Sequence, residues 1–304
     1  MVCGWPRQSR EMLTGEWKKV LDKIFDAGIP HVCFTGGEAT LRDDLSELIA
    51  YAEDLGLVTG LLTNGCRLSD AGYVKRLVDA GLDHVQITLE SHVPQVHNQM
   101  VGGEGFAATV SGIKNAVAVG LYTVTNTTLT RQNMEGIGDT VRFLHELGIT
   151  RLAMNSIIRS GRSKGGAGAL SPEELSARLA EARDAALELG MNLIWYSPTR
   201  YCELNPVALG LGIKSCTAGL YNMCIEPDGS VLPCQSYFES VGNILQDPWP
   251  KIWEHPLLKN LRSRSWVDDD CRGCAELGIC GGGCPLEAQA GEVVCTESLS
   301  NYQP

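Results

Sequence analysis

Residues 26–38 read Asp-Ala-Gly-Ile-Pro-His-Val-Cys-Phe-Thr-Gly-Gly-Glu, and this stretch contains the pattern from which the fold follows. A helix that ends in a left-handed residue favours glycine there, which Gly28 supplies. An aliphatic residue and a β-rich run come next, so a short turn leads into a strand predicted over His31–Thr35. The strand ends at Gly36-Gly37-Glu38.

The same order of helix end, glycine, aliphatic residue and strand recurs along the first two thirds of the chain. Strands that alternate with helices of this length indicate βαβ units and a parallel sheet. Six strands are too few for a closed eight-stranded barrel, so the pattern predicts an α/β fold with an open, partial (β/α)6 barrel. The further glycines are Gly56, Gly81, Gly120, Gly148 and Gly190, and the further predicted strands are Val58–Thr63, His84–Glu90, Tyr122–Leu129, Leu152–Ile158 and Asn192–Tyr196.

Two helices and one loop have clear sequence signals. A helix over Glu16–Ala27 places five large apolar residues on one face, namely Trp17, Val20, Leu21, Ile24 and Phe25. A second helix begins with Ser171 as its cap and Pro172 in its first turn. The glycine-rich stretch Ser160–Gly168 is either a lid over the barrel or an ordinary surface loop.

Composition restricts the partners of the protein. The 304 residues are 44% apolar and carry a net charge of -11, with no Lys/Arg run. Nucleic acid and anionic membrane surfaces are therefore not expected as partners. No apolar stretch is long enough for a transmembrane helix, and Met1–Arg7 contains no signal-peptide core. We expect a cytoplasmic protein.

The twelve cysteines are concentrated in the last third of the chain. Clustered cysteines without an export signal favour metal binding over a disulfide framework. Cys216 is followed by twelve residues, then Gly229, then four residues, and then Cys234. A later run, from Cys271 to Cys284, has the form C-x2-C-x5-C-x3-C. Thiolates bind iron–sulfur clusters or zinc, and residues 281–283, all glycine, leave room for backbone to wrap closely. The eight cysteines of this region are Cys216, Cys224, Cys234, Cys271, Cys274, Cys280, Cys284 and Cys295.

The order and spacing of these cysteines resemble the SPASM domain of radical S-adenosylmethionine (SAM) enzymes. The resemblance implies two auxiliary [4Fe-4S] clusters. The first set of ligands would be Cys216, Cys234 and Cys284, and the second would be Cys271, Cys274, Cys280 and Cys295. Cys224 is a candidate fourth ligand of the first cluster; the alternatives are an open site for a small molecule and a thiol that points into the core. Structural zinc is the competing interpretation of the cysteines.

The barrel half also resembles this family. Gly36, Gly37 and Glu38 look like the GGE motif that binds the amino group of SAM, with Ala39 in place of the usual proline. Alone, this motif is equally a glycine turn before a helix. By resemblance Asn64, Thr88 and Asn126, at the ends of later strands, would contact the SAM carboxylate and ribose. Arg159 and Arg162 are further candidates for a carboxylate partner, and all of these residues are otherwise polar strand ends. No catalytic residue is identified.

The printed sequence contains no CxxxCxxC loop, which the family uses to bind the SAM cluster. Val2-Cys3 resembles the end of that loop, and a helix and the GGE strand follow as in the family. We therefore interpret the chain as N-terminally truncated, with the first barrel strand and two cysteines expected before Met1. The alternative is a degenerate member that keeps only the auxiliary clusters. As printed, the chain is expected to be inactive and to expose an unpaired sheet edge.

The predicted domains are a partial radical SAM barrel over residues 1–204, lacking its first strand, and a small SPASM domain over residues 205–304. The resemblance implies that the full-length form, with one SAM-binding and two auxiliary [4Fe-4S] clusters, uses a 5′-deoxyadenosyl radical to modify a peptide, a protein or a cofactor precursor. An external electron donor is the expected partner. The alternative function is a non-catalytic iron–sulfur or zinc protein.

Overall fold

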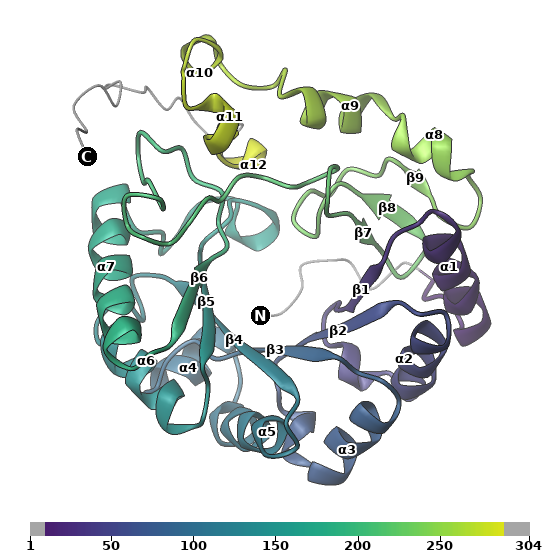
Figure 1. The fold of residues 1–304 in the computed structure, drawn as a ribbon, viewed down its shortest axis with the longest axis horizontal. Helices are drawn as coiled ribbons and strands as arrows, with labels where there is room; N and C mark the ends of the chain where they lie inside the picture. Colours follow the sequence, from purple (N-terminus) through teal and green to yellow (C-terminus); the bar gives the residue numbers. More distant parts are fainter. Residues whose placement is uncertain (1–9, 289–304) are drawn as a thin grey trace.

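The computed structural model describes residues 10–288, and its centre is a curved sheet of six parallel strands (Figure 1). The strands follow one another in sequence order, and each pairs in parallel with the next. Within the described residues, β1 and β6 therefore have one strand neighbour each. The strands are β1 (His31–Phe34), β2 (Val58–Thr63), β3 (His84–Thr88), β4 (Tyr122–Leu129), β5 (Arg151–Ser156) and β6 (Asn192–Trp195).

The glycine turns are formed as predicted from the sequence. All six glycines that precede a strand have a positive φ, from 65° at Gly190 to 99° at Gly81. This backbone region costs residues with a Cβ atom energy, so glycine is required to connect each helix to its strand over so short a distance. The partial (β/α)6 barrel is confirmed, with strand limits that differ from the predictions by at most two residues at each end.

Helices cover the outer face of this sheet (Figure 1). The Ser171 hydroxyl accepts a hydrogen bond from the Glu174 amide, which confirms the predicted cap. In the first helix Val20, Leu21 and Ile24 are buried, but Phe25 is 50% exposed because it lies on the outer side of the last turn. The helices are α1 (Thr14–Asp26), α2 (Leu45–Asp54), α3 (Ala71–Asp79), α4 (Pro94–Val101), α5 (Phe106–Ala118), α6 (Ile137–Glu146) and α7 (Pro172–Glu188), with 3-10 turns at Ala39–Leu41, Arg67–Ser69 and Gly161–Ser163.

The C-terminal third forms a separate antiparallel sheet and a series of short helices. These elements extend from the α1 side of the molecule to the α7 side, across the opening of the barrel sheet (Figure 1). The strands are β7 (Cys224–Ile225), β8 (Ser230–Leu232) and β9 (Gly242–Asn243), and the helices are α8 (Trp249–Trp253), α9 (Pro256–Ser263), α10 (Asp269–Arg272), α11 (Leu277–Cys280) and α12 (Pro285–Ala288).

Two hydrophobic cores hold these parts together. The larger core lies between the parallel sheet and the helices α2, α3, α5, α6 and α7. The second core joins Val20 and Leu21 of α1 to Val231 of β8 and Leu258 of α9. The C-terminal third thus packs directly on the first helix of the barrel.

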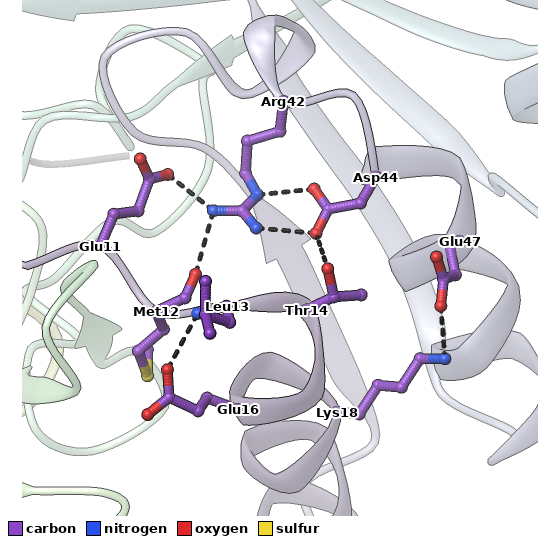
Figure 2. A network of polar contacts seen from close by, with 9 residues as sticks. All are labelled: Glu11, Met12, Leu13, Thr14, Glu16, Lys18, Arg42, Asp44 and Glu47. Carbon is purple, nitrogen blue, oxygen red and sulfur yellow. Dashed lines mark hydrogen bonds and ion pairs between the residues drawn. The ribbon is translucent and has the colours of Figure 1, made fainter.

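A polar network ties the start of α1 to the connection between β1 and α2 (Figure 2). Arg42 donates two hydrogen bonds to the Asp44 carboxylate, at 2.9 and 2.7 Å, and one to Glu11 at 2.7 Å. The Thr14 hydroxyl donates to the same Asp44 carboxylate at 2.6 Å. The hydrogen bonds from Arg42 lower the pKa of Asp44, because they stabilise its ionised form. The network therefore holds the start of α1 against Arg42, which lies four residues after Glu38 in the sequence.

Within residues 10–288, we find no helix that is both long enough and apolar enough to cross a lipid bilayer.

Candidate functional site

The carboxyl end of β1 presents an open glycine edge with a strongly bonded glutamate beside it. Gly36 and Gly37 are exposed, and a Cβ atom added to Gly36 meets nothing within 4 Å. Glu38 Oε1 accepts hydrogen bonds from the hydroxyls of Thr40 and Thr63, each at 2.7 Å, and Oε2 accepts one from the Asn64 amide at 2.8 Å. Glu38 therefore joins the ends of β1 and β2, and Oε2 retains capacity for one more donor.

Asn64 lies at the end of β2 with its backbone and side chain both used in the turn. Its Oδ1 accepts the Cys66 amide at 2.8 Å, and its carbonyl accepts the Thr109 hydroxyl at 2.7 Å. The residue is exposed, and its backbone N–H donates to Glu38 Oε2. This geometry brings the predicted residues of β1 and β2 together.

Thr88 and Asn126 are direct neighbours across β3 and β4. Asn126 donates through Nδ2 to Asn155 Oδ1 at 2.9 Å, while its own Oδ1 is buried without a hydrogen-bond partner. An orphaned buried acceptor costs about 1–3 kcal/mol unless a donor reaches it. A ligand that carries hydroxyl or amino groups fits this position, as the ribose or amino group of SAM does.

One buried carboxylate at this edge was missed by sequence reasoning. Glu90 follows β3 and is 4% exposed; its Oε2 accepts the Thr128 amide at 2.7 Å, and its own amide donates to His97 Nδ1 at 3.2 Å. Burial raises the pKa of Glu90 to about 7, although the Thr128 amide opposes the shift. The available signal was a carboxylate that directly follows Leu89 at the end of the predicted strand His84–Glu90.

Three of the predicted cluster ligands lie together in the C-terminal third. Burial raises the pKa of the Cys234 thiol, and Cys216 raises it further through its charge. Burial likewise raises the pKa of Cys284 to about 12, with smaller contributions from Cys216 and Cys234. Thiols that influence one another in this way are close in space. The three thiols assigned to the first auxiliary cluster therefore lie within electrostatic reach of one another.

Backbone amides near these three sulfurs favour the thiolate form. Ala218 lowers the pKa of Cys216, Ser236 and Tyr237 lower that of Cys234, and Leu286 and Glu287 lower that of Cys284, each against the larger effect of burial. Amide donors stabilise thiolate over thiol, and hydrogen bonds to sulfur also set the potential of an iron–sulfur cluster. The donor set and its amides fit a cluster of iron and sulfide. Within residues 10–288, no three His, Cys, Asp or Glu side chains converge as ligands of a single metal ion.

The second set of ligands is described in part. Cys271 and Cys280 are buried and close enough for the charge of Cys280 to raise the pKa of Cys271, although burial is the main cause. The Tyr201 amide donates to Cys280 Sγ at 3.4 Å, and Cys274 is exposed. Cys3 and Cys295 lie outside the described residues.

The glycine run at residues 281–283 is required by its own neighbours in the protein. All three glycines have a positive φ between 75° and 82°. A Cβ atom at Gly282 would lie 2.6 Å from Val267, and one at Gly283 would lie 3.2 Å from the Arg200 amide. The run therefore reverses the chain between Cys280 and Cys284 in a tightly packed space.

Cys224 lies in β7 opposite Leu232, and its thiol donates to Glu226 Oε1 at 3.8 Å.

Arg159 contacts the C-terminal third: its Nε lies 3.3 Å from Glu287 Oε2, and its amide donates to Glu287 Oε1 at 2.7 Å. The next residue, Ser160, donates to the carbonyl of Ser236. The loop after β5 thus rests on two segments that begin at Cys234 and Cys284. The side chain of Arg162 lies outside what the structure describes.

An open parallel barrel with a glycine edge at the ends of its strands, joined to a cysteine-rich C-terminal third, is the arrangement of a β/α-barrel iron–sulfur protein. The profile of the radical SAM superfamily matches residues 3–144, and that of an iron–sulfur cluster-binding domain named SPASM matches residues 216–275. The chain is 31% identical to a PqqA peptide cyclase of Bradyrhizobium diazoefficiens over 98% of its own length and 80% of that protein. It is 29% identical to the PqqA peptide cyclase of Methylocella silvestris over 98% and 81%.

Two solved structures have a similar fold. Streptococcus suis SuiB bound to the precursor peptide SuiA gives a TM-score of 0.75 at 20% identity, over 94% of this chain and 68% of that one. The structure of anSMEcpe with bound AdoMet and a Kp18Cys peptide gives 0.68 at 19% identity, over 90% and 81%. The chain belongs to the radical SAM superfamily and carries a SPASM iron–sulfur domain.

Proposed function

We propose that this protein modifies a peptide by radical SAM chemistry. The observation that carries the proposal is the placement, in one chain, of an open strand edge with an orphaned acceptor and of three thiols that influence one another's pKa. The relatives support a peptide substrate, because those similar over 98% of the chain are peptide cyclases.

We assign the SAM site to the carboxyl ends of the first four strands. Gly36 and Gly37 would let the methionine end of SAM approach the backbone, and the remaining capacity of Glu38 Oε2 would accept its ammonium group. Asn126 Oδ1 would accept a ligand hydroxyl or amino donor, with Thr88 beside it and Asn64 at the entrance. When bound with its cluster, SAM supplies a radical that removes a hydrogen atom from the substrate.

We assign the cysteines to two auxiliary [4Fe-4S] clusters. Cys216, Cys234 and Cys284 would hold the first, with Cys224 as a candidate fourth ligand, and Cys271, Cys274, Cys280 and Cys295 would hold the second. The domain boundary would fall at residues 204–205, after β6. An external one-electron donor would reduce the clusters, and we place the protein in the cytoplasm.

The third [4Fe-4S] cluster would be the one that binds SAM, and the family holds it with three thiolates. Cys3 alone precedes α1, and one thiolate does not anchor a cluster that needs three. We propose that the chain as printed does not cleave SAM and that a form with a completed CxxxCxxC loop does. A non-catalytic iron–sulfur protein is the second candidate, favoured by this same observation.

Anaerobic reconstitution tests the proposal. The printed chain should bind about eight irons with equal sulfide, and a form whose loop is completed around Cys3 should bind about twelve and release 5′-deoxyadenosine from SAM. Cys284→Ala should lose about four irons, whereas the matched control Cys66→Ala, a half-buried thiol beside Thr109, should lose none. Zinc without sulfide would contradict the assignment. Full clusters without SAM cleavage in the completed form would favour the non-catalytic candidate.

A further inference from the structure

A buried arginine lies beside the second set of cysteines. Arg200 is only 8% exposed and belongs to the short connection that leaves β6 for the C-terminal third. A buried cation is costly unless a partner compensates it. Its Nη1 lies 2.9 Å from Asp268 Oδ2, and the Asp268 side chain is 40% exposed.

Asp268 connects this arginine to a cysteine of the second set. The Asp268 carboxylate caps α10 and accepts the Cys271 amide at 2.9 Å. Arg200 therefore reaches the Cys271 backbone through a single carboxylate. Arg200, Asp268 and Cys271 thus form one electrostatic unit.

The residue after Arg200 contacts Cys280, another cysteine of the second set. The amide of Tyr201 donates to Cys280 Sγ, and a Cβ atom on Gly283 would lie 3.1 Å from Arg200 Cγ. The position of the Arg200 side chain is therefore fixed by the loop that separates Cys280 from Cys284. Its charge is held close to the sulfurs and is shielded from water.

We propose that Arg200 is a positioning residue that raises the reduction potential of the second auxiliary cluster, and that Asp268 opposes it. A cluster bound by four thiolates is negatively charged, and the uptake of one electron from an external one-electron reductant adds to that charge. A nearby buried cation favours the reduced form, and a nearby carboxylate disfavours it. This inference rests on the proposed function, because it requires the cluster.

Redox titration of the anaerobic holoprotein, followed by electron paramagnetic resonance, tests the proposal. Arg200→Gln should make the second auxiliary cluster harder to reduce by roughly tenfold in its equilibrium constant, about 59 mV for one electron. Asp268→Asn should shift the potential the other way, and Arg200→Lys should remain near the wild type. Arg272→Gln is the matched control, because Arg272 adjoins Cys271 but its side chain is 57% exposed and so screened by solvent. Cys284→Ala, which removes the first cluster, identifies the signal.

Opposite shifts are a result that a merely structural role does not produce. If Arg200→Gln and Asp268→Asn move the potential in the same direction, or leave it unchanged with full iron and sulfide, this inference alone is overturned. If the wild-type protein binds no iron and sulfide, the proposed function fails first and this inference fails with it.

Discussion

Replacement of Glu38 by glutamine separates the scaffolding role of this carboxylate from a role in binding. Glu38 accepts hydrogen bonds from Thr40, Thr63 and Asn64, so it connects the ends of β1 and β2 before any ligand binds. Glutamine keeps one acceptor oxygen but loses the charge. It also presents an amide group to the Asn64 N–H, which then has no acceptor.

The expected cost follows from these contacts. Hydrogen bonds to a charged group contribute about 1.5–3 kcal/mol each, and neutral ones contribute about 1 kcal/mol. Loss of the charge weakens the bonds to Oε1, and the Asn64 bond is lost entirely. Because Glu38 is partly exposed, solvent recovers some of this energy. We expect Glu38→Gln to lower the free energy of unfolding by about 2–3 kcal/mol.

Thermal unfolding followed by circular dichroism measures this change. For a chain of this size, about 2 kcal/mol corresponds to a decrease of roughly 4 °C in the melting temperature. Thr63→Val removes one donor to Glu38 together with the acceptor of the Gly65 amide; it is the comparison and should cost about 1–2 kcal/mol. An unchanged melting temperature in Glu38→Gln, with a measurable loss in Thr63→Val, would refute the scaffolding role.

Two further predictions concern Glu90 and the loop after β5. Glu90 has a pKa of about 7 in the folded protein, against an ordinary value of 4.5 in the unfolded chain. Between these two pH values the folded protein keeps a proton on Glu90 that the unfolded chain has released. The free energy of unfolding therefore falls as the pH rises through that range. Glu90→Gln should gain stability relative to the wild type over the same interval, by about 3 kcal/mol in urea unfolding at most; a constant difference would contradict the assigned pKa. Glu287→Ala should speed trypsin cleavage at exposed Lys164 roughly fivefold, because it removes an ion pair and an acceptor that hold the loop. Glu254→Ala, which breaks an exposed ion pair with Lys259 elsewhere, should leave the cleavage rate unchanged. Equal rates in both variants would argue that Glu287 does not hold the loop after β5.

The sequence predicted those features that local chemistry determines. A glycine between a helix and a strand indicates a positive φ that other residues adopt only at a cost, and all six of these glycines have one. The grouping of Cys216, Cys234 and Cys284 came from a family resemblance and stays a prediction, although Cys216 and Cys234 each raise the pKa of Cys284. The partner of Arg159 was not predictable, because Glu287 is 128 residues away and nothing local indicates it. The burial of Glu90 likewise depends on Thr128 and His97, which come from other segments.

The second hydrophobic core joins the C-terminal third to the barrel. The network at Arg42 fixes the start of α1 near Glu38, and the buried face of α1 packs on β8 and α9. On the opposite side, the loop after β5 contacts Ser236 and Glu287 next to the first set of cysteines. The proposed SAM edge and the proposed cluster loops are therefore held at both ends of the sheet opening. Because the second core and the contacts of this loop join the two predicted domains, we expect the domains to unfold together.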